Sequence, residues 1–183
     1  MQSAMKTTLP IHPLFSALAR QIRNPQSAAF LVLAVVALTL AGAWTFQSLG
    51  FKPCELCLKQ RFAYYAALPL AAAVIYLARN AMPLLARVVL AALAVIFFGN
   101  AILAAYHAGV EWKFWAGPGD CTGAFAKPAS MEAFRNQLQN FRAVRCDEVS
   151  LRILGLSLAG WNFLVSAGLS MTAVLGATAP ERR

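Results

Sequence analysis

Four long stretches without a charged residue constrain this chain more than any other feature of its sequence. They cover residues 24–51, 62–78, 88–110 and 153–180. A helix needs about 20 predominantly apolar residues to cross a bilayer, and a backbone in lipid must satisfy its own hydrogen bonds. The sequence therefore predicts an all-α, polytopic membrane protein built as a four-helix transmembrane bundle.

The composition agrees with this fold class. Apolar residues make up 60% of the 183-residue chain and charged residues 13%, whereas soluble domains have about 45–50% and about 25%. The mean hydropathy is +0.60. The net charge of +9 does not indicate nucleic-acid binding, because the basic residues are scattered between the apolar stretches. Composition thus argues against a soluble enzyme, a disordered chain and a coiled coil.

The predicted membrane domain covers residues 27–176, between tails at 1–26 and 177–183 that we expect to be cytoplasmic. The first stretch continues well past its small-residue Ala41-Gly42-Ala43 site, which favours a retained span over a cleaved signal. The predicted spans are 28–46, 62–78, 88–107 and 153–175, and the two loops opposite the termini are 47–61 and 108–152.

The longer of these two loops is predicted to contain a short amphipathic helix over residues 131–142. Ser130 is a suitable N-cap, and Phe134, Leu138 and Phe141 recur on one helical face. Such a helix lies on the bilayer surface or packs on the end of the bundle, and the sequence favours neither.

All four cysteines, Cys54, Cys57, Cys121 and Cys146, fall in the two loops opposite the termini. The basic residues do not decide the orientation, since they are not enriched on the side of the termini. Cysteines gathered on one side of a membrane protein favour the oxidising side. We therefore expect the cysteine loops to lie outside and both termini to lie in the cytoplasm.

The first cysteine pair, Cys54 and Cys57, has the spacing of a tight redox disulfide. Nearby cations and the start of the second helix favour a thiolate there. Arg61 follows Cys57 by one helical turn, where its guanidinium suits either a carbonyl group of a ligand or an interfacial anchor. An inert disulfide and a metal site are the alternatives, and a second closely spaced cysteine motif for a metal is missing.

The second pair, Cys121 and Cys146, is widely spaced within the long loop. A disulfide that closes such a loop is feasible, and it would be a target for a thiolate from another protein.

His107 lies at the outer end of the third stretch, where it either orients a ligand or faces water. Asn100 and Asn162 lie inside the third and fourth stretches, and we expect both to bond across helices.

Together these features resemble the disulfide bond formation protein B (DsbB) family, in a shorter alphaproteobacterial form. The resemblance rests on the four spans, on the Cys-Glu-Leu-Cys-Leu-Lys-Gln-Arg segment at 54–61, and on the spaced cysteine pair in the last outer loop. It implies a thiol:quinone oxidoreductase of the bacterial inner membrane. Such a protein reoxidises a periplasmic thioredoxin-fold oxidase, DsbA, and passes two electrons to a membrane quinone, either ubiquinone or menaquinone.

The resemblance also implies a role for each cysteine. Cys121 accepts the mixed disulfide from the partner oxidase, and Cys146 is its companion. Cys54 receives the exchange from that pair. Cys57 lies next to the quinone.

The implied quinone contacts are Cys57, Arg61 and His107. Gln60 stands where the family archetype has an acid, which argues against a proton-handling role for this position. Three alternatives stay open on the residues alone. They are the same chemistry with a dedicated oxidase partner, a soft-metal site at Cys54, Cys57 and His107, and a membrane protein whose disulfides only staple its loops.

Overall fold

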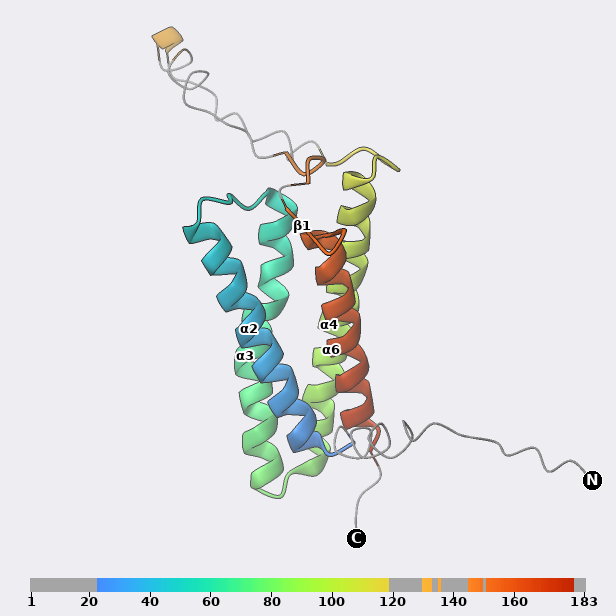
Figure 1. Cartoon of the computed structure of the whole chain (residues 1–183). Helices are drawn as coiled ribbons and strands as arrows, with labels where there is room; N and C mark the ends of the chain where they lie inside the picture. The colour runs from blue at the N-terminus through green and yellow to red at the C-terminus, as the bar shows by residue number, and fades with distance from the viewer. Residues whose placement is uncertain (1–22, 119–129, 133–134, 136–144, 150, 180–183) are drawn as a thin grey trace, which may run out of the picture.

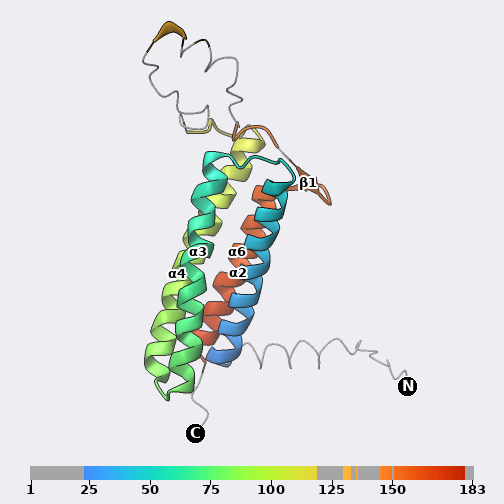
Figure 2. The same cartoon turned by 90° about the vertical axis from the view of Figure 1, so that its left-hand side faces the viewer.

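A computed structural model of the chain describes residues 23–118, 130–132, 135, 145–149 and 151–179. Its long helices are α2 (Pro25–Ser48), α3 (Glu55–Arg79), α4 (Pro83–Glu111) and α6 (Leu158–Ala177). All four are long and apolar enough to cross a membrane. Figures 1 and 2 show them side by side in one elongated bundle. The predicted all-α, four-span fold is confirmed.

Local sequence signals begin these helices. The side chain of Asn24 accepts a hydrogen bond of 3.0 Å from the Gln26 amide at the start of α2, and Pro25 occupies the first turn. The Ser157 hydroxyl accepts one of 3.1 Å from the Gly160 amide at the start of α6. Each cap satisfies an amide that would otherwise have no helical acceptor.

The interior of the bundle is rich in small side chains, and many large apolar side chains face outward. Fully or almost fully buried alanines allow the helices to approach closely, and they include Ala67, Ala71, Ala94 and Ala104. Leu38 is 72% exposed and Val95 is 71% exposed. An apolar surface of this kind suits contact with lipid.

The two ends of the bundle differ in their chemistry. The start of α2, the α3–α4 connection and the end of α6 lie together at one end (Figure 1). There Arg87 donates a hydrogen bond of 2.7 Å to the carbonyl of Ala179, and the Arg79 guanidinium lies 5.8 Å from the centre of the Phe30 ring. The opposite end carries the described cysteines.

Two helices begin at positions other than predicted. Helix α3 begins at Glu55 rather than at residue 62, because Cys54 caps it and its first turns carry charges that an uncharged window excludes. Helix α6 begins at Leu158 rather than at 153. A small antiparallel hairpin, β1 (Arg152–Ile153) and β2 (Leu156–Ser157), comes before it.

The remaining helix bounds also exceed the predicted spans. Helix α2 covers Pro25–Ser48 instead of 28–46, and α4 covers Pro83–Glu111 instead of 88–107. The tail residues 1–22 and 180–183 lie outside the described residues, and so does most of the predicted amphipathic helix at 131–142.

Candidate functional site

The first cysteine pair forms the N-terminus of α3. Cys54 is the N-cap residue, and its sulfur accepts a hydrogen bond of 3.3 Å from the Cys57 amide. The two sulfur atoms lie 2.7 Å apart, and both cysteines are free thiols. Cys54 is buried and Cys57 is half-buried. The pair is therefore placed for direct exchange between a dithiol and a disulfide.

His107 of α4 also contacts Cys54. Its Nε2 atom lies 3.6 Å from the Cys54 sulfur, and the ring is almost completely buried. The hydrogen bond with the Cys57 thiol, followed by the contacts with His107, lowers the pKa of Cys54 to about 4, although burial opposes the shift. In the reduced pair, these contacts favour the thiolate form of Cys54.

A buried polar network joins this histidine to the interior of the bundle. Gln60 of α3 contacts His107 Nδ1 at 3.1 Å and accepts a hydrogen bond from the Asn162 amide of α6. Tyr64 donates to Asn162. Asn100 donates to Ser166 across α4 and α6 at 2.9 Å. The expectation that Asn100 and Asn162 bond across helices is confirmed.

A cavity of about 310 Å³ opens beside the thiol pair. Its walls are mostly apolar residues of α2, α3 and α6, including Phe46 and Val165. Cys57, Arg61 and His107, the three residues that the sequence assigns to a cofactor, all line it. Cys54 is absent from this lining, so within the described residues only the second thiol of the pair faces the cavity.

Arg61 is held at the cavity by the neighbouring helix. Its guanidinium donates to the side-chain oxygen of Gln47 at 2.8 Å and to the carbonyl of Ala43 at 3.3 Å. Both acceptors belong to α2. Arg61 therefore lies in a fixed position on the cavity wall. Its charged guanidinium can donate a hydrogen bond to a carbonyl group of a ligand.

Cys146 reaches the same end of the bundle from the long loop. It is 1% exposed and belongs to one buried cluster with Cys54, Leu56 and Val110. Cys146 is disulfide-bonded, whereas Cys54 and Cys57 are free. Cys121 lies outside the described residues. The tertiary structure thus brings a cysteine of the second pair against the first pair.

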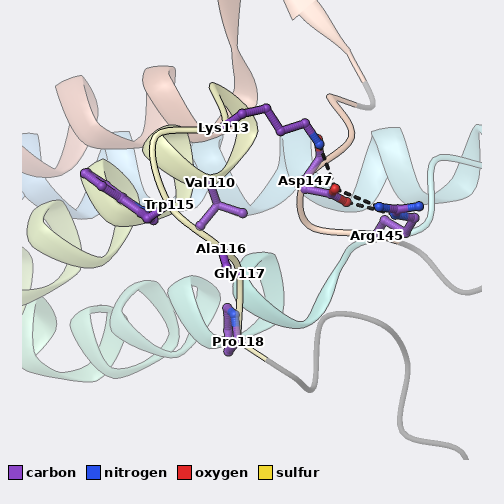
Figure 3. Close-up of a pocket in the computed structure, with 8 residues that line it drawn as sticks. All are labelled: Val110, Lys113, Trp115, Ala116, Gly117, Pro118, Arg145 and Asp147. Atoms are coloured by element: carbon purple, nitrogen blue, oxygen red, sulfur yellow. Dashed lines mark hydrogen bonds and ion pairs between the residues drawn. The ribbon is translucent and has the colours of Figure 1, made fainter.

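Charged side chains hold the Cys146 segment to the end of α4 (Figure 3). Lys113 donates to the Asp147 carboxylate at 2.6 Å and to its carbonyl at 2.9 Å. Arg145 donates to both carboxylate oxygens, at 2.9 and 2.8 Å. The hydrogen bond with Arg145, followed by that with Lys113, holds the pKa of Asp147 well below its usual range. We call these three residues the charged tether.

The chain after α4 folds back beneath the tether. Lys113 has a positive φ of 64°, and the Trp115 indole donates a hydrogen bond of 2.9 Å to the Tyr106 carbonyl. A Cβ atom at Gly109 would lie 2.1 Å from the Trp115 ring, so this close approach requires glycine. Together with the tether, this turn encloses a second cavity of about 370 Å³ (Figure 3).

We expect Asp147→Asn to slow the exchange between the two cysteine pairs by about two- to fivefold, because the tether is exposed and such pairs contribute little each. Rapid mixing with a reduced oxidase, acid quenching and alkylation would measure the rate. Because the pKa of Asp147 is lowered, its carboxylate stays charged throughout the pH range in which Asp ordinarily titrates. The tether therefore weakens only as the pH falls below that range.

The matched control is Glu148→Gln, which neutralises the neighbouring and more exposed carboxylate. Equal rates in the two variants would show that the tether does not place Cys146. Loss of the difference at high ionic strength would support the electrostatic explanation, because salt screens exposed charges.

Several residues of the site are not predictable from the motifs around the cysteines. Glu111 lies one helical turn after His107, its carboxylate interacts with Cys54, and one of its oxygens has no hydrogen-bond partner among the described residues. Tyr64 likewise follows Gln60 by one turn. The spacing of four residues from His107 and from Gln60 was the available signal. Lys113 and Asp147 carried no such signal.

The ligand atoms of Cys54, Cys57 and His107 lie within 4.8 Å of one another. A closed zinc site takes four ligands. In the described ranges, no fourth histidine, cysteine or carboxylate joins this group. The three described ligand groups are one fewer than a closed zinc site takes.

Fold and site together define a four-span membrane protein that carries a buried dithiol next to an apolar cavity. Residues 25–176 match the sequence profile of the disulfide bond formation protein DsbB, and the chain belongs to this family. No curated protein and no solved structure matches the chain. Family membership makes it a multi-pass membrane protein of disulfide-bond formation. DsbB proteins use quinones and serve a disulfide oxidase.

Proposed function

We propose that this protein is a thiol:quinone oxidoreductase that reoxidises a periplasmic thioredoxin-fold disulfide oxidase. One observation carries the proposal: the two thiols of the first pair face different surroundings. Both thiols contact the buried cluster that contains Cys146, with Cys54 inside it and Cys57 at its edge, but of the two only Cys57 lines the apolar cavity. A dithiol with one side toward each redox partner is suited to pass electrons between them.

The cavity residues fit a quinone. Its mostly apolar walls suit the ring and the start of an isoprenoid tail, and its volume of about 310 Å³ accommodates a quinone head group. The Arg61 guanidinium, fixed by α2, would donate to a quinone carbonyl oxygen. A bound quinone supplies an acceptor for two electrons.

The cysteines would carry the electrons by thiol–disulfide exchange. A thiolate of the partner oxidase attacks the disulfide of the second pair at Cys121, which forms a mixed disulfide with Cys121 and releases the Cys146 thiolate. The released Cys146 thiolate attacks the disulfide of the first pair at Cys54, and the Cys57 thiolate leaves on the cavity side. The second thiolate of the partner then attacks the mixed disulfide, so the partner leaves oxidised and Cys121 leaves as a thiolate. That thiolate attacks Cys146, which restores the second disulfide and releases the Cys54 thiolate. Each exchange forms one S–S bond and breaks another, so the pair of electrons moves inward.

The orientation belongs to the same proposal. In the bacterial inner membrane, a periplasmic oxidase can reach Cys121 and Cys146 only if the cysteine end of the bundle faces the periplasm. The start of α2, the α3–α4 connection and the end of α6 would then lie on the cytoplasmic side (Figure 1).

Quinone absorbance during turnover tests the proposal. The full chain in detergent is mixed with a reduced thioredoxin-fold oxidase and with ubiquinone or menaquinone. We expect loss of the quinone signal only when all three components are present. No turnover with either quinone, although the disulfides are intact, would contradict the proposal and favour a structural or metal-binding role. Turnover with only one of several oxidases would indicate a dedicated partner.

The variant Cys146→Ser tests the order of exchange. In this variant Cys121 is a single thiol that attacks the disulfide of the added, oxidised partner, and without Cys146 the resulting mixed disulfide cannot be resolved from within the second pair. We therefore expect this complex to accumulate on non-reducing gels and to disappear with dithiothreitol. A trapped complex that contains Cys54 instead would contradict the proposed order.

A further inference from the structure

The imidazole of His107 is held at both of its nitrogen atoms. Nε2 lies 3.6 Å from the Cys54 sulfur, and Nδ1 lies 3.1 Å from the side-chain nitrogen of Gln60. The ring is only 2% exposed. A neutral imidazole carries one N–H donor and one acceptor, and its neighbours decide which nitrogen holds the proton.

The amide of Gln60 has its own orientation fixed by Asn162. Its oxygen accepts a hydrogen bond from the Asn162 side-chain nitrogen, so its nitrogen is the atom left to face His107. The Asn162 oxygen in turn accepts from Tyr64 and, at 3.3 Å, from Ser166. Gln60 is only 5% exposed.

This chain of donors ends at the sulfur of Cys54. If the amides of Gln60 and Asn162 were both turned over, the network would run in the opposite direction and His107 would present an Nε2 lone pair to Cys54. That sulfur already accepts the Cys57 amide at 3.3 Å and is favoured as the thiolate of the reduced pair. Two acceptors facing each other in a buried site are costly, which favours the first direction.

We propose that Gln60 and Asn162 are positioning residues that keep His107 neutral with its proton on Nε2, so that His107 donates a hydrogen bond to the Cys54 sulfur. His107 then acts on the thiol pair as well as lining the cavity. A hydrogen bond from a neutral ring stabilises a thiolate without adding a buried positive charge beside it.

The role in exchange rests on the proposed function. When the disulfide between Cys146 and Cys54 is resolved, an attacking thiolate forms a new S–S bond with Cys146. The electron pair of the old bond goes to the Cys54 sulfur. The Nε2–H of His107 already faces this leaving sulfur, and a stabilised leaving thiolate departs faster.

Other ionisable groups also face Cys54. Cys57 contacts it from α3, and the Glu111 carboxylate interacts with it from α4 and disfavours its negative charge. We therefore expect replacement of Gln60 to alter the Cys54 thiol through His107, while the Glu111 carboxylate stays in place.

Nitrogen NMR of the reduced, full-length protein labelled with ¹⁵N-histidine tests the proposal without quinone or oxidase. The chain has two histidines, and the variant His12→Gln assigns the signals. At neutral pH we expect His107 to be protonated on Nε2 only. A proton on Nδ1, with or without one on Nε2, would overturn the proposal.

Two variants separate positioning from simple packing. In Gln60→Glu the carboxylate has no N–H to donate, so we expect the Nδ1 atom of His107 to become protonated. In Gln60→Met the Nδ1 atom loses its partner. We then expect the midpoint of the pH profile of Cys54 alkylation to rise by about one unit, roughly a tenfold change in the thiol equilibrium.

The control is Ser170→Ala, which removes a half-buried hydroxyl of α6 that donates a hydrogen bond to the Ala94 carbonyl outside this network. We expect its tautomer and alkylation profile to match the wild type. An unprotonated Nδ1 in Gln60→Glu, or an unchanged profile in Gln60→Met, would overturn the proposal. Because these measurements omit quinone, a wild type that fails to reduce quinone while keeping the Nε2–H tautomer would contradict only the proposed function.

Discussion

Replacing Cys57 by serine is expected to reduce the rate of quinone reduction by at least about a thousandfold, because the thiol of the first pair that faces the cavity would be lost. The Cys54 thiol would remain, so the variant should still form a mixed disulfide with the second pair or with the partner. Quinone absorbance measures the first effect, and mass spectrometry after alkylation measures the second.

Leu58→Ser is the matched control for this variant. Leu58 is the neighbouring residue of α3, it is 42% exposed, and it does not line the cavity. We expect nearly normal turnover. If Cys57→Ser keeps more than a tenth of the wild-type rate, electrons do not leave through Cys57, and the path through the cavity is wrong.

The variant Arg61→Met is expected to raise the KM for quinone by about ten- to a hundredfold, the range expected when a hydrogen bond from a charged group is lost. Methionine keeps much of the apolar stem that packs on the cavity wall. Exchange among the cysteines should proceed at the normal rate, because Arg61 contacts Gln47 and Ala43 and not the thiols. Steady-state kinetics with varied quinone would separate KM from kcat.

Lys59→Met removes the same charge two residues away and is the control for Arg61. Lys59 lies 3.7 Å from Glu55 on the exposed side of α3, outside the cavity lining. We expect its quinone kinetics to match the wild type. Equal KM values for wild type and Arg61→Met would remove Arg61 from the quinone site.

Much of the fold could be predicted because hydrophobicity acts along the chain. Each span is an unbroken apolar run, so its existence does not depend on what it packs against. The ends were less predictable, since Glu55, Lys59 and Arg61 are charged and still belong to α3. A count of uncharged residues stops before such polar first turns, and the small hairpin before α6 has no apolar signal of its own.

The individual members of the candidate site were partly predictable, whereas their mutual contacts were not. The pattern around Cys54, Cys57 and Arg61 is local, because one helical turn separates its members. The contact between Gln60 and His107 joins residues of different helices. It depends on how α3 and α4 are rotated about their axes, and the apolar pattern of a membrane helix specifies that rotation poorly.

The sequence by itself determined that this chain spans a membrane four times and carries a cysteine pair at the start of one span, because apolar length and residue spacing are local properties. Only the tertiary structure decided that Cys146 is buried in one cluster with Cys54, that Cys57 faces an apolar cavity, and that His107 connects the pair to Gln60. These placements arise from the packing of helices and loops that are distant in sequence, so no segment of the chain specifies them alone.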